Sequence, residues 1–476
     1  MRKFYLLLFL FLISSAAFGQ AGNYRSLGSG LWGTAGTWER DADSNGSFEE
    51  SPSTVAPTVN TTAGTITIRN SHVVNVGANV SVDQVVIQSG GTLVVNALIT
   101  ATLGAGAGDD INVNAGGNLN VNGIINLVAP LAGNANRLRV FGTVNNTGTF
   151  QNSTTAKFIF EAGANYVHLF DGTTANAIPT AGFNVTSTAT ISGFVTGGAI
   201  PPTGLGQSFG NFVWNTPNMD QFIDLMGLIT VNGDFQVDDT GAGGFYINQT
   251  GATPNFNVGG DFIVNGGLFG FIGGTSADGN LTILGDLNIT NGFFQIAEDV
   301  NASINLTGDL NVSGGTLEFS AISANVDLNM GGDFSLIGGD ISVSAGTGNI
   351  NFVNTTVAQS LTSTLIPTGP INYSVGSLSI LEIAGSSNFL SGGSNGAMDI
   401  AGTLRLGSTV AGGAIQNGIS AGNIRISTAN RTYQTGSTFV YDGTSAQFIG
   451  DGFPSGSDVN LVIDNASNVT LSTSLD

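Results

Sequence analysis

The sequence predicts an all-β protein that folds as a right-handed parallel β-helix (a β-solenoid) with coils of about 25 residues and irregular insertions. Three observations predict this fold: a high glycine content, a period-two alternation of apolar residues and an internal repeat. Glycine accounts for 71 of 476 residues. Each glycine inside an α-helix costs roughly 1 kcal/mol, so a helical protein is disfavoured. Apolar residues make up 41% of the chain, which favours a packed core over disorder.

The internal repeat centres on a glycine that is followed by aspartate. Five segments align around this step without gaps, with glycine at 233, 260, 285, 308 and 332, so the successive steps are 27, 25, 23 and 24. Gly91, Gly117 and Gly142 form an earlier series with steps of 26 and 25. Met398–Leu406 repeats the pattern once more, with threonine in place of aspartate after Gly402. One coil of a parallel β-helix takes about this many residues.

Apolar residues lie at −4, −2, +2 and +4 from the repeated glycine, with mostly polar or small residues between them. Side chains alternate between the two faces of a strand, so coils stacked at ~4.8 Å would bury ladders of like side chains. The two expected ladders are Ile229, Phe256, Leu281, Ile304 and Leu328, and Phe235, Phe262, Leu287, Leu310 and Phe334. In one copy a hairpin turn at Asn232-Gly233 stays an alternative to a corner of the coil.

Stacking in register would also align the aspartates of the repeat in a column. Its members are Asp234, Asp261, Asp286, Asp309 and Asp333. Neighbouring carboxylates would then lie ~5 Å apart and repel one another. Two interpretations stay open: each aspartate accepts a hydrogen bond from a backbone N–H at a turn, or calcium bridges successive coils.

The N-terminus predicts export. Arg2 and Lys3 precede an apolar run, Phe4–Ile13, and small residues at Ala17 and Gly19 suit a cleavage site. The run is too short to span a bilayer, which takes ~20 helical residues, and no later segment qualifies. We therefore predict an extracellular or cell-surface protein with no transmembrane segment.

Composition excludes two classes of function. Eleven basic residues against 32 acidic ones, a net charge of −21, exclude a nucleic-acid footprint, and the absence of cysteine excludes disulfides and thiol chemistry.

Composition and spacing divide the chain into seven parts. The expected parts are a signal peptide (1–19), an N-terminal cap with Trp32, Trp38 and an acidic loop (20–63), β-helix coils (64–150), an insertion module (151–225), coils with Gly-Asp repeats (226–345), a further solenoid module (346–436) and the start of another module (437–476). Because the last part begins a coil and stops, we expect further modules beyond it.

The best single motif for a ligand is a candidate calcium loop. Asp41, Asp43 and Asn45, followed by Gly46, place oxygen ligands at positions 1, 3 and 5 and glycine at 6, as in the first half of a calcium loop. Position 12 is Pro52 rather than the closing carboxylate, and Glu49 and Glu50 are nearby substitutes. A polar surface turn is the alternative. Calcium is the one cofactor that the sequence suggests.

Catalytic signals are weak. Asp109-Asp110 and Asp238-Asp239 are the adjacent aspartate pairs, and neighbouring strand residues point to opposite faces, so each pair presents one outward carboxylate unless it lies in a turn. His168 lies near Tyr166 and Phe170, which favours a packed aromatic cluster over a ligand pocket. We predict that the protein is not an enzyme and has no catalytic residues.

Several segments resemble large secreted surface proteins of Bacteroidota. The matching segments are 32–38, 66–76, 89–96, 164–168, 177–180, 207–215 and 440–447. The resemblance implies a surface or secreted protein, exported by a signal peptide and then by type IX secretion through a C-terminal sorting domain, which this sequence does not show. The N-terminal block also resembles G8-like extracellular domains.

Together these observations predict a non-enzymatic, adhesin-like repeat protein that presents binding surfaces on a β-solenoid. Its expected partners are a polysaccharide, another surface protein or a solid substrate, and not nucleic acid. The sequence predicts neither the ligand nor the oligomeric state. A carbohydrate-active β-helix enzyme, either a polysaccharide lyase or a glycoside hydrolase, is the alternative, and it rests on analogy of fold.

Overall fold

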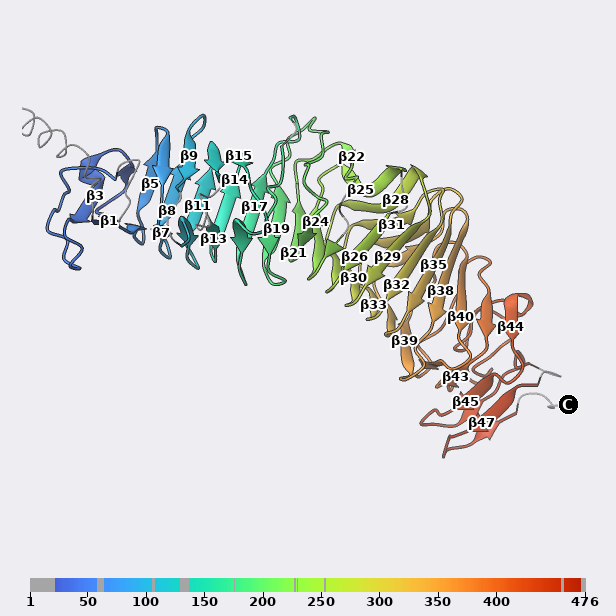
Figure 1. The fold of residues 1–476 in the computed structure, drawn as a ribbon. Coiled ribbons are helices and arrows are strands. Elements are labelled where there is room, and N and C mark those ends of the chain that lie inside the picture. Colours follow the sequence, from blue (N-terminus) through green and yellow to red (C-terminus); the bar gives the residue numbers. More distant parts are fainter. Residues whose placement is uncertain are drawn as a thin grey trace, which may run out of the picture. The chain divides into compact units, whose positions relative to one another are not determined.

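A computed structural model gives the fold of this chain (Figure 1). It describes residues 22–57, 64–104, 108–128, 137–174, 176–226, 228, 230–251, 254–454 and 458–471. The predicted signal peptide and the ladder residue Ile229 lie outside these residues. Within them the chain is nearly all β, and parallel sheets stack into a β-solenoid of about 17 turns. The predicted fold class is therefore confirmed.

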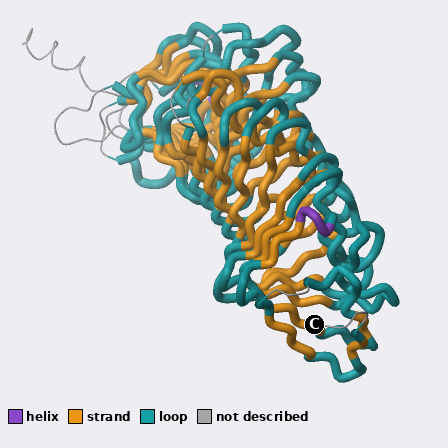
Figure 2. Tube along the Cα trace, turned by 90° about the vertical axis from the view of Figure 1, so that its right-hand side faces the viewer, coloured by secondary structure: helices purple, strands orange, loops and turns teal. Residues whose placement is uncertain are grey.

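The chain forms two compact units. The N-terminal unit comprises Met1–Phe170, Asn176–Gly193 and Pro202–Gly204, and the C-terminal unit comprises Asp171–Ala175, Phe194–Pro201 and Leu205–Asp476. The described helices are two short 3₁₀ turns, η2 (Ala35–Thr37) and η3 (Thr428–Asn430). In each unit the strands of successive coils lie side by side (Figure 2). No described helix is long and apolar enough to cross a membrane.

Three sheets build the N-terminal unit. The first contains, in order, β3 (Trp38–Asp41), β1 (Asn23–Ser26), β4 (Ile66–Ile68), β7 (Val85–Ile87), β10 (Ile111–Val113), β13 (Leu138–Val140), β16 (Phe158–Phe160) and β18 (Gly182–Phe183). The second contains β2 (Gly30–Leu31), β5 (Val73–Val76), β8 (Thr92–Val95), β11 (Asn118–Val121), β14 (Thr143–Asn146), β17 (Asn165–Leu169) and β19 (Thr188–Ser192). The third contains β6 (Val80–Val82), β9 (Thr100–Leu103), β12 (Ile124–Asn126) and β15 (Thr149–Gln151). All these neighbours are parallel except β1 and β3, which form an antiparallel pair at the N-terminal cap.

Three further sheets and one two-stranded pair build the C-terminal unit. The ten-stranded sheet contains β20 (Ser208–Phe209), β23 (Thr230–Val231), β26 (Asn255–Val258), β29 (Gly279–Ile283), β32 (Ala302–Leu306), β35 (Asn325–Met330), β38 (Thr347–Phe352), β40 (Ile371–Val375), β42 (Met398–Ile400) and β44 (Arg431–Tyr433). The second sheet contains β21 (Asn211–Asn215), β24 (Phe235–Asp239), β27 (Phe262–Val264), β30 (Leu287–Ile289), β33 (Leu310–Val312), β36 (Phe334–Leu336), β39 (Gln359–Ser363), β41 (Ile380–Ile383), β43 (Thr403–Leu406), β45 (Thr438–Tyr441) and β47 (Asn460–Ile463). The six-stranded sheet contains β22 (Phe222–Asp224), β25 (Gly244–Gly251), β28 (Leu268–Ser276), β31 (Phe293–Ala297), β34 (Thr316–Ser320) and β37 (Asp340–Ser342), and β46 (Gln447–Phe448) pairs with β48 (Val469–Thr470).

Both predicted ladders are present in the C-terminal unit, apart from Ile229. In the ten-stranded sheet Phe256 pairs with Leu281, Leu281 with Ile304 and Ile304 with Leu328. In the second sheet the pairing runs through Phe235, Phe262, Leu287, Leu310 and Phe334. All of these paired side chains are buried, so both ladders face the interior.

The glycine of each repeat lies at a corner of the coil and not in a hairpin. β23, which precedes Gly233, belongs to the ten-stranded sheet, whereas β24, which follows it, belongs to the second sheet. The hairpin alternative is therefore excluded at this copy.

The predicted insertion module and the predicted further solenoid module both contain coil strands. In the part predicted as an insertion (151–225), β16 continues the pairing of β13, and β17 and β19 continue that of β14. The segment 346–436 holds β38 to β44 in the same parallel stacking. Longer connections between these strands shift the sequence period without interrupting the ladders.

Candidate functional site

The predicted calcium loop brings three carboxylates together. One carboxylate oxygen from each of Asp41, Asp43 and Glu49 lies within 4.8 Å of the other two. Asp41 ends β3 and is buried, whereas Asp43 and Glu49 are exposed. Burial alone would raise the pKa of Asp41, but hydrogen bonds from the N–H groups of Gly46, Asn23 and Asn45 outweigh it and hold that pKa below its usual value.

The third predicted ligand, Asn45, uses its polar atoms inside the loop. Its side-chain amide donates to Asp43 Oδ2 over 2.9 Å, and its Oδ1 accepts the N–H of Ser47 over 2.8 Å. Its own backbone N–H donates to Asp41 Oδ1 over 3.1 Å. These bonds are those of a turn capped by side chains.

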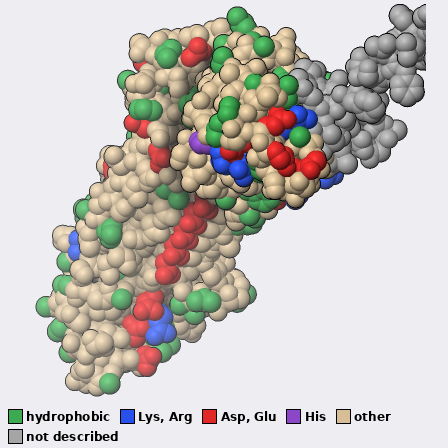
Figure 3. All heavy atoms as spheres, turned by 90° about the vertical axis from the view of Figure 1, so that its left-hand side faces the viewer, with side chains coloured by type: hydrophobic (Ala, Val, Ile, Leu, Met, Phe, Trp, Pro, Cys, Tyr) green, Lys and Arg blue, Asp and Glu red, His purple; other side chains and the backbone are tan. Residues whose placement is uncertain are grey.

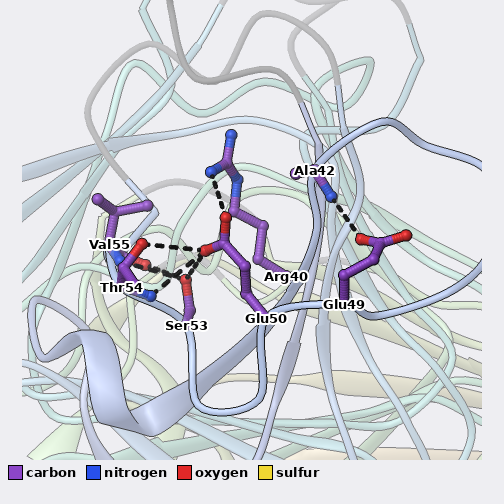
Figure 4. A network of polar contacts seen from close by, with 7 residues as sticks. All are labelled: Arg40, Ala42, Glu49, Glu50, Ser53, Thr54 and Val55. Carbon is purple, nitrogen blue, oxygen red and sulfur yellow. Dashed lines mark hydrogen bonds and ion pairs between the residues drawn. The ribbon is translucent and has the colours of Figure 1, made fainter.

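Glu49 and Glu50 take different roles in the same loop (Figure 4). Glu49 Oε2 accepts the N–H of Ala42 over 3.2 Å and belongs to the carboxylate cluster. Glu50 instead accepts hydrogen bonds from Arg40 (3.1 Å) and from Thr54 (3.1 Å from its hydroxyl). Of the two substitutes that the sequence offered, the structure therefore brings Glu49 into the cluster.

The donor set is compatible with calcium, which prefers carboxylate and carbonyl oxygens. Asp41, Asp43 and Glu49 would hold the ion, and Asn45 would have to turn its Oδ1 away from Ser47 to join them. In the described arrangement, backbone N–H groups from Asn45 and Gly46 already satisfy Asp41 at 3.1 and 3.0 Å. The loop is thus satisfied as a capped turn, and calcium binding stays a prediction.

The aspartates of the repeat form the expected column on the C-terminal unit. In all but the last, Asp333, the Oδ1 atom accepts the backbone N–H of the aspartate one coil further on, over 2.8 Å from Asp261 to Asp234, 2.8 Å from Asp286 to Asp261, 2.8 Å from Asp309 to Asp286 and 2.7 Å from Asp333 to Asp309. Figure 3 shows acidic side chains aligned in a row, as this register requires. The aspartates therefore make the backbone bond that the first interpretation expected, although with the next coil rather than within one turn.

The glycine before each aspartate is explained by the same contact. A Cβ atom on Gly260, Gly285 or Gly308 would lie 2.2–2.3 Å from the Oδ1 of the aspartate in the preceding coil. It would also meet the backbone of the preceding glycine within 3.0 Å. The Gly-Asp repeat is thus one unit, in which glycine allows the close approach and aspartate supplies the bond.

The aspartate pairs weighed as catalytic candidates are engaged locally. Asp109 forms an ion pair with Arg139 at 3.7 Å. Asp110 is buried, and burial raises its pKa to about 8; the N–H of Arg137 opposes this rise and Asp83 adds to it. Asp238 Oδ1 accepts hydrogen bonds from Gln236 (2.6 Å) and Asn265 (3.0 Å), while Asp239 accepts the N–H of Gly241.

A polar cluster on the six-stranded sheet was not apparent from the sequence. The hydroxyl of Tyr246 donates to Glu298 Oε1 over 2.9 Å, and Tyr246 lies over Gly270, where a Cβ would meet its ring at 2.2 Å. Gln295 and Glu318 follow in the same row and are both buried. Because these residues come from different coils, far apart along the chain, a motif search has no short pattern to find.

Polar side chains also form regular rows on the outer face of the ten-stranded sheet. Asparagines of successive coils donate to one another, for example Asn351 to Asn329 over 3.0 Å and Asn372 to Asn349 over 2.9 Å. The alternation noted in the sequence accounts for their outward direction, because their strand neighbours are the buried ladder residues.

His168 lies in the N-terminal unit, in the packed aromatic cluster that the sequence favoured. It is fully buried, its ring centroid lies 5.5 Å from that of Phe170, and its Nδ1 is 2.8 Å from the hydroxyl of Tyr166. Burial lowers its pKa to about 4, and its Nε2 has no hydrogen-bond partner. The histidine is therefore a neutral core residue.

Comparison with known proteins adds no relative: no family model, no curated protein and no solved structure matches this chain.

Proposed function

We propose that this chain is an exported surface protein whose β-solenoid displays binding surfaces and does not catalyse a reaction. The observation that carries the proposal is repetition. The outer face of the ten-stranded sheet offers amide and hydroxyl groups from coil after coil, joined by hydrogen bonds such as that from Asn351 to Asn329. Repeated, stacked units that contact only their neighbours are typical of proteins that present an extended binding surface.

The basic and apolar pattern of residues 1–19 supports export. The resemblance of seven segments to secreted surface proteins of Bacteroidota supports a surface location reached through type IX secretion. Among the expected partners, a polysaccharide is favoured over a surface protein or a solid substrate, because sugar hydroxyls both donate and accept hydrogen bonds, as the outward amides do.

Surface display is tested in the source organism. Intact cells are treated with a protease, and the chain is followed with an antibody against the Gly-Asp coils. We expect cells with the full-length chain to lose the signal on protease treatment, and cells with a variant lacking residues 1–19 to keep it. Equal protection of both forms would refute the proposal.

One observation favours the enzymatic alternative, namely that the polar cluster of Tyr246, Gln295, Glu298 and Glu318 contains two carboxyl groups. Paired carboxyl groups are the usual means of cleaving glycosidic bonds. We propose that the cluster is structural, since Ser342 and the N–H of Ser344 donate to Glu318 and Gly274 donates to Glu298. A polysaccharide panel that yields products with the wild type and none with Glu298→Gln would establish the enzyme instead.

A further inference from the structure

One part of the ten-stranded sheet carries two adjacent rows of outward polar side chains, which we name the amide face. The first row contains Asn305, Asn329, Asn351, Ser374, Asp399 and Thr432, and the second contains Asp327, Asn349 and Asn372. All belong to the C-terminal unit, on β32, β35, β38, β40, β42 and β44. Each strand contributes alternate residues, because the intervening ones fill the core.

Hydrogen bonds between coils hold the amide face in one arrangement. In the first row the donors reach the preceding coil over 3.2 Å (Asn329 to Asn305), 3.0 Å (Asn351 to Asn329) and 2.6 Å (Ser374 to Asn351). In the second row the distances are 2.8 Å (Asn349 to Asp327) and 2.9 Å (Asn372 to Asn349). A ligand would therefore meet polar groups whose rotamers are already fixed, which lowers the entropy cost of binding.

The second row ends in a hollow. Tyr373 pairs with Met398, so Ala397 follows Asn372 in the row and its methyl group replaces an amide side chain. The N–H of Ala397 donates to Asn372 Oδ1 over 2.9 Å, which fixes the last amide of the row. The hollow has a volume of about 300 Å³ and is open to solvent, with Asp327 and Asp399 as the charged residues of its lining.

Charge and hydrogen-bonding capacity restrict the class of ligand. No lysine or arginine is among the described residues that line the hollow, and both of its charged groups are carboxylates, so sulfated, phosphorylated or uronic-acid polymers would be repelled. Each asparagine in a row keeps a second N–H and a second carbonyl lone pair after making its ladder bond. Groups that both donate and accept, in fixed positions, match sugar hydroxyls, which do the same.

The repeat of the rows matches a polymer. Coils succeed one another at ~4.8 Å, a step comparable to one sugar unit of an extended polysaccharide. Successive sugar units along the solenoid axis would then meet equivalent amide groups. A lipid or an apolar peptide would find little to bind, because the outward groups of both rows are amides, hydroxyls and carboxylates.

We propose that the amide face binds a neutral polysaccharide chain that lies along the coils, with one sugar unit seated in the hollow beside Ala397. The proposal deepens the display function proposed above, on which it rests, by naming the site and the class of ligand.

The test uses the purified full-length chain and affinity electrophoresis in gels that contain dextran, mixed-linkage β-glucan, galactomannan, xylan or polygalacturonate. Ala397→Gln fills the hollow and keeps the backbone bond to Asn372, and Asn351→Ala combined with Asn372→Ala removes two amides. Thr282→Gln fills another hollow of the same sheet, and Asn311→Ala removes an amide that donates to Asn288 on the second sheet over 3.0 Å, so these two are matched controls.

We expect at least one neutral polysaccharide to retard the wild type, with affinity at least tenfold weaker for Ala397→Gln and for the double variant and unchanged for the controls. If the double variant fails to fold, Ala397→Gln decides. Retardation by polygalacturonate alone, no retardation by any neutral polysaccharide, or equal binding by Ala397→Gln would overturn the proposal. Self-association that Ala397→Gln abolishes would also overturn it, since the face would then bind a second copy. Surface display is tested by protease treatment of cells, whereas polysaccharide binding is tested on the purified chain. Each of the two proposals can therefore be refuted without the other.

Discussion

The two units differ in the hydrogen-bond acceptor that they use at the glycine corner of a coil. In the N-terminal unit the residue after the corner glycine donates its N–H to a backbone carbonyl of the preceding coil, as Asn118 does to Gly91 and Thr143 to Gly117, both over 2.9 Å. In the Gly-Asp coils of the C-terminal unit the equivalent residue is aspartate, and its N–H donates to the side chain of the preceding aspartate, as from Asp286 to Asp261 over 2.8 Å.

This difference explains why only the Gly-Asp coils show a strict sequence repeat. A backbone acceptor is available whatever the side chain, so threonine and asparagine alternate after the N-terminal corner glycines. A side-chain acceptor must be repeated in every coil. A hydrogen bond to a charged group contributes about 1.5–3 kcal/mol, whereas neighbouring carboxylates in water repel by roughly 0.8 kcal/mol, so the column is stabilising on balance.

The strongest test of the comparison is Gly285→Ala. The new Cβ would lie 2.2 Å from Asp261 Oδ1 and within 2.7 Å of the Gly260 backbone, so the coils would have to separate. We expect a loss of about 3 kcal/mol in the free energy of unfolding, measured by urea denaturation. Gly418→Ala, where the nearest atom is 4.0 Å away, is the control and should change stability little. Equal effects of both substitutions would show that the corner tolerates a side chain.

The second prediction concerns pH and the N-terminal unit. The pKa of His168 is about 4 in the folded state, below the ordinary value of about 6.5 in the unfolded state. As pH falls through 6.5 towards 4, the unfolded state therefore takes up a proton that the folded state does not, and stability decreases. The total loss is about 3 kcal/mol below pH 4.

The measurement is the unfolding free energy from pH 7 to 4, for the wild type and for His168→Gln. Asp110, whose pKa is raised, contributes with the opposite sign over pH 4–8, so the difference between the two proteins isolates the histidine. Hydrogen exchange should locate the loss on β17 and its neighbours. Parallel pH profiles for the two proteins would show that His168 does not cause the loss of stability.

The third prediction, of a smaller effect, distinguishes the hydrogen bond that Asp286 accepts from the negative charge that it carries. Asp286→Ala leaves the N–H of Asp309 without its acceptor, and we expect a loss of about 1–2 kcal/mol. Asp286→Asn keeps an oxygen at that place and should retain most of the stability. Asn118→Ala should cost less than Asp286→Ala, because its backbone bond to Gly91 is unchanged. A loss as large for Asp286→Asn as for Asp286→Ala would mean that charge, rather than the bond, stabilises the column.

The smallest expected effect is that of calcium on the N-terminal cap. If Asp41, Asp43 and Glu49 bind the ion, calcium at ten times its Kd should stabilise the protein by about 1.4 kcal/mol, and Asp43→Ala should reduce the shift. Thermal melts at fixed ionic strength with calcium or chelator measure it, with exposed Asp299→Ala as control. Identical curves in calcium and in chelator would mean that these carboxylates only cap the turn.

The sequence predicts most of the fold because the relevant signals are local. Alternation of apolar residues places Phe262 and Leu287 inside, and the spacing of glycines gives the coil length. The strands in 151–225 are harder to recognise, because variable connections such as that between β17 and β19 obscure a period that is visible only at constant length. For the calcium loop, the spacing of Asp41 and Asp43 predicts that both belong to the candidate site. The roles of Glu49 and Asn45 depend on how the turn closes, which the spacing does not predict.

By itself, the sequence determined the fold class, the two apolar ladders and the column of aspartates, since each follows from periodicity along one chain. The tertiary structure decided what those columns bond to. Only stacking shows that Asp261 accepts a hydrogen bond from Asp286 in the next coil, that Gly285 is required by that contact and that Ala397 opens a hollow at the end of an amide row. These are contacts between residues one coil apart along the chain, whose geometry depends on register and close approach rather than on any local preference of the chain.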